Sequence, residues 1–137
     1  MNNIGSHNIE KLIIWQKSVD LACDIYKITA DFPDEEKFGL VSQMRRPGVS
    51  IPSNIAEGAG RGYNAQFAQF LSIASGSTNE LFTQLIIANR LGFITDINKI
   101  KSQIEEIGKM NTVLRNKLRN DYVEEDIIKY DINDLNT

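Results

Sequence analysis

Two rows of apolar residues run along the first segment of the chain, residues 9–31, and both recur at helical spacing. The rows lie about 100° apart and cover roughly half of the helix circumference, which is wider than the ~100° stripe that one bundle seam requires. The pattern predicts a helix with a second buried face, and a subunit interface is the simplest explanation. Trp15 and Tyr26 are its expected anchors, with packing inside the core as the alternative for either ring. The rows are Leu12, Trp15, Val19, Ala22 and Tyr26, and Ile14, Leu21, Ile25 and Ile28.

The second helical segment, residues 38–57, contains two prolines. Pro47 and Pro52 each lack an amide donor and crowd the carbonyl four residues earlier, so a kink or a brief interruption is predicted. The helix can restart near Pro52, and the glycine-rich residues 58–62 end it. Before the segment, the acidic residues 34–36 supply a capping side chain and favourable negative charge.

A third helix is predicted between Asn64, as its capping residue, and Gly92, at its end. Its middle, residues 74–78, contains only small side chains. Small side chains let a neighbouring backbone approach closely, at some cost in helix propensity at Gly76. We therefore expect a close helix crossing here rather than a ligand slot.

The fourth helix has the most regular spacing in the chain. It follows Asp96, a capping residue, and its seam positions alternate three and four residues apart, which is the pattern of a heptad. Asn111 interrupts the apolar seam, so it either fixes register or oligomer state, or its amide reaches a bundle end or water. The seam positions are Ile97, Ile100, Ile104, Ile107, Asn111, Leu114 and Leu118.

Together these segments predict an all-α fold, an antiparallel up-down-up-down four-helix bundle with a proline-kinked second helix. No segment alternates as a strand does. The bundle is expected to occupy residues 9–120 as a single domain. Residues 1–8 are expected to form a flexible leader, and residues 121–137 an acidic tail that is either disordered or docked as an arm.

Composition and charge place the chain among soluble globular proteins. Of its 137 residues 42% are hydrophobic and 24% charged, and no run approaches the ~20 apolar residues needed to span a membrane. The N-terminus lacks a secretion pattern, so a cytoplasmic location is expected. The net charge of −3 conceals the acidic tail, because residues 1–120 hold 14 basic and 12 acidic side chains, a net of +2. This charge allows polyanion binding but indicates it only weakly.

Side chains suited to catalysis are few. Cys23 is the only cysteine and is expected to be a small buried hydrophobe. His7 is the only histidine and precedes the bundle, so a di-metal site built from Glu-x-x-His pairs is excluded. The glycine-rich residues 58–62 lack the sequence context of a nucleotide-binding loop. The sequence therefore predicts a protein that is not an enzyme, without catalytic residues, metal site or cofactor.

A polar stripe runs along one side of the second helix, with members that fall within about 80° of one another on a continuous helix. It either forms a structural network, with Glu57 paired to Arg61, or presents a recognition surface. In the second case Arg45, Arg46 and Arg61 engage phosphates or an acidic partner. The members of the stripe are Gln43, Arg46, Ser50, Asn54, Glu57 and Arg61.

Many of these residues belong to motifs that carry a family resemblance. The motifs are Leu12 to Gln16, Phe38-Gly39-Leu40, residues 42–46 (Ser-Gln-Met-Arg-Arg), residues 49–58 (Val-Ser-Ile-Pro-Ser-Asn-Ile-Ala-Glu-Gly) and Ala74 to Leu81. With them, the chain resembles the four-helix-bundle family of 23S rRNA intervening-sequence proteins over about residues 9–120. Relatives of that family act as accessory proteins to the reverse transcriptases of diversity-generating retroelements.

The resemblance implies a barrel-like homopentamer, with RNA, DNA or a reverse transcriptase as partner and no catalysis. Family members usually have Ala-Ala or similar where this chain has Pro47-Gly48, which implies a sharper kink here. The leading hypothesis is a nucleic-acid-associated accessory protein that binds through its arginines. The rival hypothesis is a protein-interaction scaffold whose polar stripe is structural.

Overall fold

The computed structural model describes residues 9–120, and every regular element in that range is helical. The predicted leader at residues 1–8 and the predicted acidic tail at residues 121–137 lie outside the described residues. The all-α prediction with four long helices is therefore confirmed. The long helices are α2 (Ile13–Thr29), α3 (Ser42–Ala59), α4 (Asn64–Arg90) and α5 (Asn98–Arg119), and the short turns are η1 (Ile9–Lys11), η2 (Asp34–Glu36) and η3 (Lys37–Val41).

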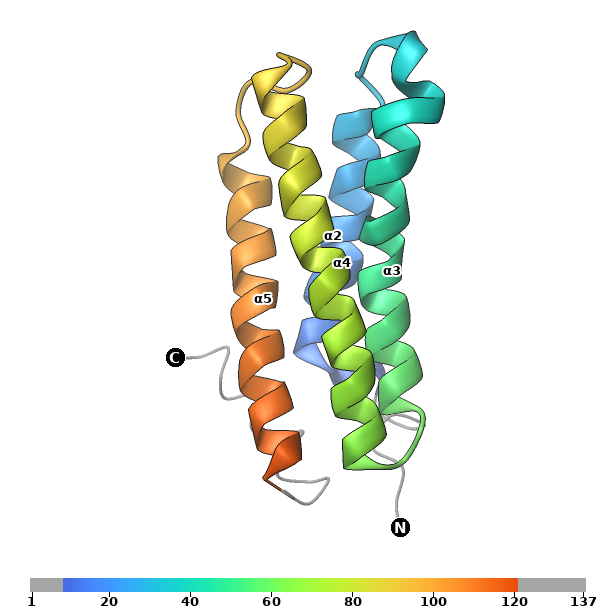
Figure 1. Cartoon of the computed structure of the whole chain (residues 1–137), viewed down its shortest axis with the longest axis vertical. Coiled ribbons are helices and arrows are strands. Elements are labelled where there is room, and N and C mark those ends of the chain that lie inside the picture. The colour runs from blue at the N-terminus through green and yellow to red at the C-terminus, as the bar shows by residue number, and fades with distance from the viewer. Residues whose placement is uncertain (1–8, 121–137) are drawn as a thin grey trace.

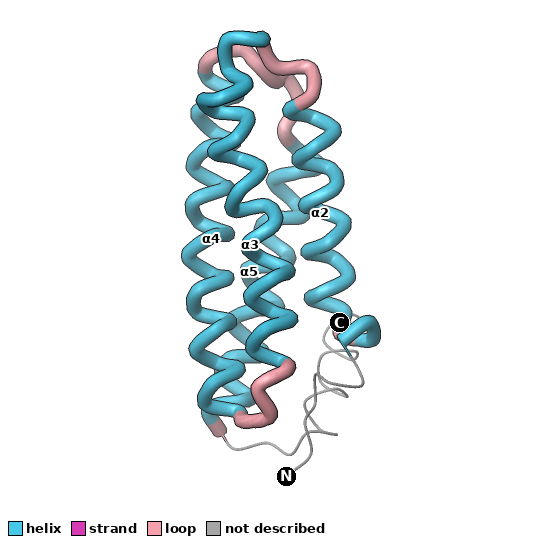
Figure 2. Tube along the Cα trace, turned by 90° about the vertical axis from the view of Figure 1, so that its right-hand side faces the viewer, coloured by secondary structure: helices cyan, strands magenta, loops and turns pink. Residues whose placement is uncertain are grey.

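The four long helices lie side by side along one axis. In Figure 1 the chain rises along α2, descends along α3, rises along α4 and descends along α5. Each long helix packs against two others, in the order α2, α3, α4, α5 and back to α2. The α3–α4 packing is the most extensive and the α2–α5 packing the least. Figure 2 shows the connecting loops at the two ends of the bundle, so its long sides are helical surface.

The core runs through the middle of the bundle and receives apolar side chains from all four long helices. On α5 the predicted heptad seam is confirmed, because its positions face this core. Ile97 packs against the core from the start of the seam. The buried seam positions are Ile100, Ile104, Ile107, Asn111, Leu114 and Leu118.

The two apolar rows of α2 differ in burial. In one row Ile14, Leu21 and Ile25 are fully buried in the core. In the other row Leu12 is buried, but the residues after it are half-buried or exposed. The wide apolar arc is thus only partly covered by the bundle itself. We call these partly covered or exposed residues the α2 strip: Trp15, Val19, Ala22 and Tyr26.

Helix α3 runs without interruption across both of its prolines. The predicted brief interruption is therefore wrong, and the kink at the prolines stays a prediction. Pro47 and Pro52 are both buried, so apolar packing offsets part of the cost of their missing amide donors. The non-helical backbone lies earlier, at Gly39, with φ −109° and ψ −115°. There the Glu36 carboxylate accepts a hydrogen bond of 2.9 Å from the Leu40 amide, which confirms the acidic cap.

Three predicted capping residues can be compared with the structure, namely those at the two ends of α4 and the one at the start of α5. Asn64 is not the cap of α4, because the capping position is Tyr63 and no side chain caps the helix there. Gly92 ends α4 as predicted, with φ 79°, and the Phe93 amide donates to the Ala88 carbonyl at 3.0 Å. Asp96 is not at the capping position of α5, which is Ile97, but its carboxylate accepts a hydrogen bond of 3.0 Å from the amide of Asn98, the first residue of the helix.

The close crossing of α3 and α4 does not depend on the small residues 74–78 alone. Ala74 and Thr78 are buried, but a Cβ added at Gly76 would meet no atom within 4 Å. A Cβ added at Gly58 would instead lie 2.6 Å from the Cβ of Phe70. The glycine that lets the two helices approach is therefore Gly58 on α3.

Asn111 joins α5 to α4 from inside the core. Its side-chain nitrogen donates a hydrogen bond of 2.9 Å to the backbone carbonyl of Leu71 on α4. Its Oδ1 is buried without a hydrogen-bond partner among the described residues. The Asn111 amide therefore does not reach a bundle end, and this contact lies within one chain. It fixes the register of α5 against α4.

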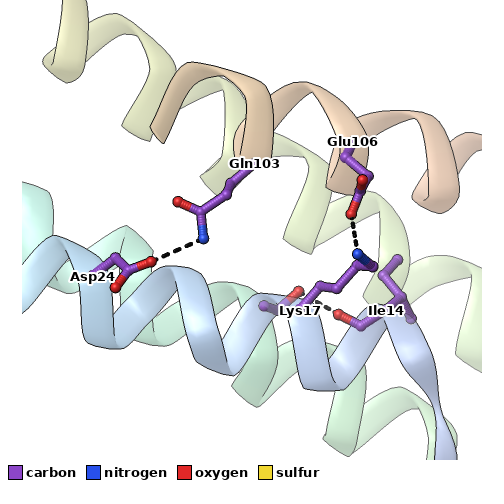
Figure 3. Close-up of polar contacts among 6 residues, drawn as sticks. Ile14, Lys17, Asp24, Gln103 and Glu106 are labelled. Carbon is purple, nitrogen blue, oxygen red and sulfur yellow. Dashed lines mark hydrogen bonds and ion pairs between the residues drawn. The ribbon is translucent and has the colours of Figure 1, made fainter. Parts of the chain in front are cut away.

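Polar contacts bridge the less extensive α2–α5 packing (Figure 3). Lys17 on α2 forms an ion pair with Glu106 on α5. Farther along, Gln103 donates a hydrogen bond of 3.0 Å to the Asp24 carboxylate, which also lies 3.5 Å from Lys99 Nζ. Ion pairs with partly exposed side chains therefore help to hold α2 against α5, and each contributes little to the stability of the fold.

Cys23 is exposed on α2, so the expectation of a buried hydrophobe is wrong. The physical reason is its position, because it lies between the partly exposed apolar row of α2 and the charged side of the helix, opposite the core-facing row. Among residues 9–120, no helix combines the length and the apolar character that crossing a membrane requires.

Candidate functional site

The middle of the polar stripe forms a structural network between α3 and α4. The hydroxyls of Ser50 and Ser77 are 3.0 Å apart. Asn54 donates from Nδ2 to both the carbonyl and the hydroxyl oxygen of Ser50, at 2.9 Å each. These three side chains are half-buried and satisfy one another, so this part of the stripe fits the structural interpretation.

The far end of the stripe carries the predicted pair. Arg61 donates to the Glu57 carboxylate at 2.8 Å, four residues away on the same side of the chain. The Arg61 guanidinium also lies 5.0 Å from the ring centroid of Phe70. Both charged side chains are about half exposed, so the pair is a surface contact of small energy.

The near end of the stripe is exposed. Gln43 and Arg46 point to solvent, and neither side chain has a hydrogen bond or ion pair with another described residue. Arg46 therefore retains all of its guanidinium donors for a ligand.

Arg45, the neighbour of Arg46, is instead engaged with α2. Its Nε donates to the Thr29 hydroxyl at 2.9 Å, and one terminal nitrogen donates to the Tyr26 carbonyl at 3.2 Å. The guanidinium stacks 4.5 Å from the centroid of the Tyr26 ring. Arg45 therefore fastens the last turn of α2 to α3, while part of its side chain still faces outward.

Arg45 and Arg46 open onto a surface hollow of about 560 Å³ between the end of α2 and the start of α3. Three basic side chains line it, and no carboxylate does. Phe38, which lies on its wall, is 88% exposed, and Lys37 Nζ lies 5.5 Å from the centroid of the Phe38 ring. We call this site the α2–α3 hollow, and its lining residues are Tyr26, Lys37, Phe38, Val41, Ser42, Arg45, Arg46 and Val49.

The structure brings together only part of the predicted site. Arg45, Arg46 and Tyr26 line the hollow, but Arg61 follows Arg46 by 15 residues and lies about 22 Å away along the helix rise. Trp15 is half-buried against the core, nearer the other end of α2.

Sequence reasoning missed Lys37 and Phe38 as site residues. The available signal was a basic residue next to an aromatic one, where Lys37 directly precedes the predicted second helix and Phe38 begins it. That signal is weak alone, because only the fold shows that η3 places both beside the arginines of α3. Within residues 9–120, no three His, Cys, Asp or Glu side chains are grouped as a metal site would need.

The motifs and the fold agree with comparisons to known proteins. The family model described as "23S rRNA-intervening sequence protein" matches residues 10–113. A crystal structure of a protein of unknown function from the S23 ribosomal protein family of Bacteroides thetaiotaomicron has a TM-score of 0.68 and 28% sequence identity. That alignment covers 75% of this chain and 98% of the other. No curated protein matches the sequence. Since the family model covers most of the bundle, the chain belongs to the family of 23S rRNA-intervening sequence proteins.

Proposed function

We propose that this protein is a non-catalytic binding protein that holds nucleic acid in the α2–α3 hollow. The observation that carries the proposal is the lining of the hollow, where Lys37, Arg45 and Arg46 meet an exposed aromatic ring without any carboxylate. Phosphate oxygens match guanidinium donors in charge and geometry. Arg46 is the strongest phosphate-binding candidate, because its side chain is exposed and unengaged within the described residues.

The way in which the basic residues are distributed supports this proposal more strongly than the net charge of the chain does. The net charge of +2 over residues 1–120 is small. Concentrating three cations around one hollow nevertheless raises the local potential, which attracts a polyanion to that place. The family description, which refers to 23S rRNA intervening sequences, makes RNA a reasonable first ligand to test.

The second part of the proposal is self-assembly through the α2 strip. Trp15, Val19 and Tyr26 leave apolar surface uncovered by the bundle, and a second copy could bury it. A homopentamer would present five hollows together, and such multivalency strengthens binding to a long polyanion.

A binding titration tests the nucleic-acid proposal. Wild-type protein is titrated into fluorescently labelled RNA and DNA oligonucleotides at several salt concentrations. We expect affinity to fall steeply with salt, with a log–log slope of about 0.7–0.9 for each phosphate contacted. The double variant Lys37→Ala plus Arg46→Ala should bind at least about tenfold more weakly and show a shallower slope.

The matched control removes two exposed basic side chains from α5, in the variant Lys109→Ala plus Arg119→Ala. It has the same net charge as the test variant but an intact hollow, so we expect nearly wild-type affinity. Absence of binding by the wild-type protein at low salt would overturn the proposal. Equal loss in both double variants would show that the hollow is not the site.

The rival function is an interaction scaffold for a protein partner, such as the reverse transcriptase that the resemblance implies. The network of Ser50, Asn54 and Ser77 favours a structural role for the middle of the stripe. The exposed part of the α2 strip would then be the partner surface. Val19→Glu should break protein association while oligonucleotide binding by a single hollow persists, and the exposed Lys27→Glu serves as the control.

A further inference from the structure

Phe38 is the most exposed large apolar side chain among the described residues, at 88% of its full accessible area. It lies on η3 at the rim of the α2–α3 hollow. The second ring of the hollow, Tyr26, already has the Arg45 guanidinium 4.5 Å from its centroid. Phe38 exposes far more of its ring than Tyr26, which is 45% exposed, so most of the Phe38 ring remains open to an incoming ligand although Lys37 Nζ lies 5.5 Å from its centroid.

The backbone holds this ring in a fixed turn. The Glu36 carboxylate accepts the Leu40 amide at 2.9 Å, across the non-helical Gly39. A Cβ at Gly39 would lie 2.6 Å from the same Glu36 oxygen, so the absence of a side chain allows this contact. Leu40 and Val41 are buried and anchor the turn to the core. Phe38 thus projects from a turn that is fastened on both sides.

We propose that Phe38 is a stacking platform for an unpaired base, so that the hollow selects single-stranded over double-stranded nucleic acid. This inference rests on the proposed function. An aromatic ring stacks on any base whose face is free, whereas the bases of a duplex already cover one another. Lys37 and Arg46 line the same hollow, so they can supply cations to the phosphates of a strand whose base stacks on Phe38.

The charges of the hollow favour this occupant over a second copy of the same surface. All ionisable side chains of the lining are basic apart from the Tyr26 phenol, so two such faces brought together would repel each other. A strand of nucleic acid supplies both the negative charge and the flat apolar faces that the lining matches.

The experiment compares single-stranded oligonucleotides with blunt-ended duplexes of equal strand length, as RNA and as DNA, at one fixed salt concentration. We expect wild-type protein to prefer the single strands. Phe38→Ala should weaken single-strand binding about fivefold or more and leave duplex binding unchanged. Phe38→Trp should restore the preference, because it keeps a stacking face. The control is Tyr63→Ala, which removes an exposed aromatic ring outside the hollow.

Three outcomes would overturn the inference. If single strands and duplexes bind equally, and Phe38→Ala changes neither, the ring is no platform, although salt-dependent loss on Arg46→Ala would leave the proposed function intact. If Phe38→Ala lowers the mass measured by light scattering and weakens both ligands alike, the ring contacts a second copy. If no oligonucleotide binds, the proposed function fails as well. Circular dichroism melting of each variant verifies that it is folded.

Discussion

Arg45 and Arg46 are neighbours in the sequence, but they differ in what their side chains contact. Arg45 donates two hydrogen bonds to the end of α2, whereas Arg46 is exposed and donates none to the described residues. Arg45→Ala should therefore lower the free energy of unfolding by about 1–2 kcal/mol. Arg46→Ala should change it by less than about 0.5 kcal/mol. Urea denaturation followed by circular dichroism measures both.

Arg45→Lys is the informative companion variant. Lysine keeps the charge but cannot reproduce the fork that reaches Thr29 and the Tyr26 carbonyl together. We expect most of the stability to be lost in it too. Equal stability of all three variants and the wild type would mean that the contacts to α2 contribute nothing.

Asn111 is a second residue whose role is decided by its partners. Its Oδ1 is buried without a partner in the described part of the chain, and such an atom costs stability. Leucine has nearly the same shape, so Asn111→Leu should raise the free energy of unfolding by about 1 kcal/mol and Tm by about 4 °C. Asn111→Ala should lower both, because it leaves a cavity. A lower Tm in the leucine variant would contradict this account.

Residue contacts could be predicted from the sequence only where they are local. The Glu57–Arg61 pair follows from a spacing of four on one helix, and it was predicted. The contact between Arg45 and Thr29 joins two helices across a turn whose geometry no local pattern specifies. The burial of Cys23 was mispredicted for a similar reason, because a residue at the border of an apolar arc can face either way.

At the scale of the elements, two glycines in helices offer a matched pair of substitutions. Gly58→Ala should destabilise the protein by about 1–3 kcal/mol, because the new methyl group would overlap Phe70 and press α3 away from α4. Gly76→Ala should stabilise it by about 0.5–1 kcal/mol, since it meets no atom within 4 Å and removes backbone freedom from the unfolded chain. Thermal melts of the two variants should shift in opposite directions.

The existence and order of the helices could be predicted because their apolar periods are long and regular. Details at their ends could not, as Asn64 shows, since the position of the preceding loop decides which residue becomes the cap. The structure shows no interruption at the prolines of α3, where the sequence predicts a kink or a brief interruption. Their rings are buried, and packing from neighbouring helices outweighs the local preference.

At the scale of the whole molecule, assembly through the α2 strip should make stability depend on concentration. If copies associate only when folded, Tm should rise as protein concentration increases. In Val19→Glu the rise should disappear, because a charge would be placed in the uncovered apolar surface. Differential scanning calorimetry over a hundredfold range of concentration measures this, with the exposed Lys27→Glu as control. A Tm independent of concentration in the wild type would speak against assembly.

The candidate site was predictable only in part, because its residues come from several elements that only the complete fold brings together. Its arginines and Phe38 fall in one predicted helix, but in the structure Tyr26 comes from α2, and Lys37 and Phe38 come from the separate turn η3. Only the folded corner between α2 and α3 brings them around a single hollow. The predicted stripe, by contrast, separates into an internal network, a surface pair and an open end.

Arg45 connects the stability of the end of α2 with the α2–α3 hollow, because it contacts both. One guanidinium fastens the last turn of α2 and also lines the hollow. If a ligand binds the hollow only while this turn is intact, its binding would suppress fraying of that helix end. Such a ligand, at a concentration a hundredfold above its Kd, stabilises the form with the intact last turn of α2 by about 2.7 kcal/mol. Amide hydrogens in the last turn of α2, such as that of Ala30, would then exchange with solvent about 100-fold more slowly. Hydrogen exchange at this turn can thus report a ligand before its chemical identity is known.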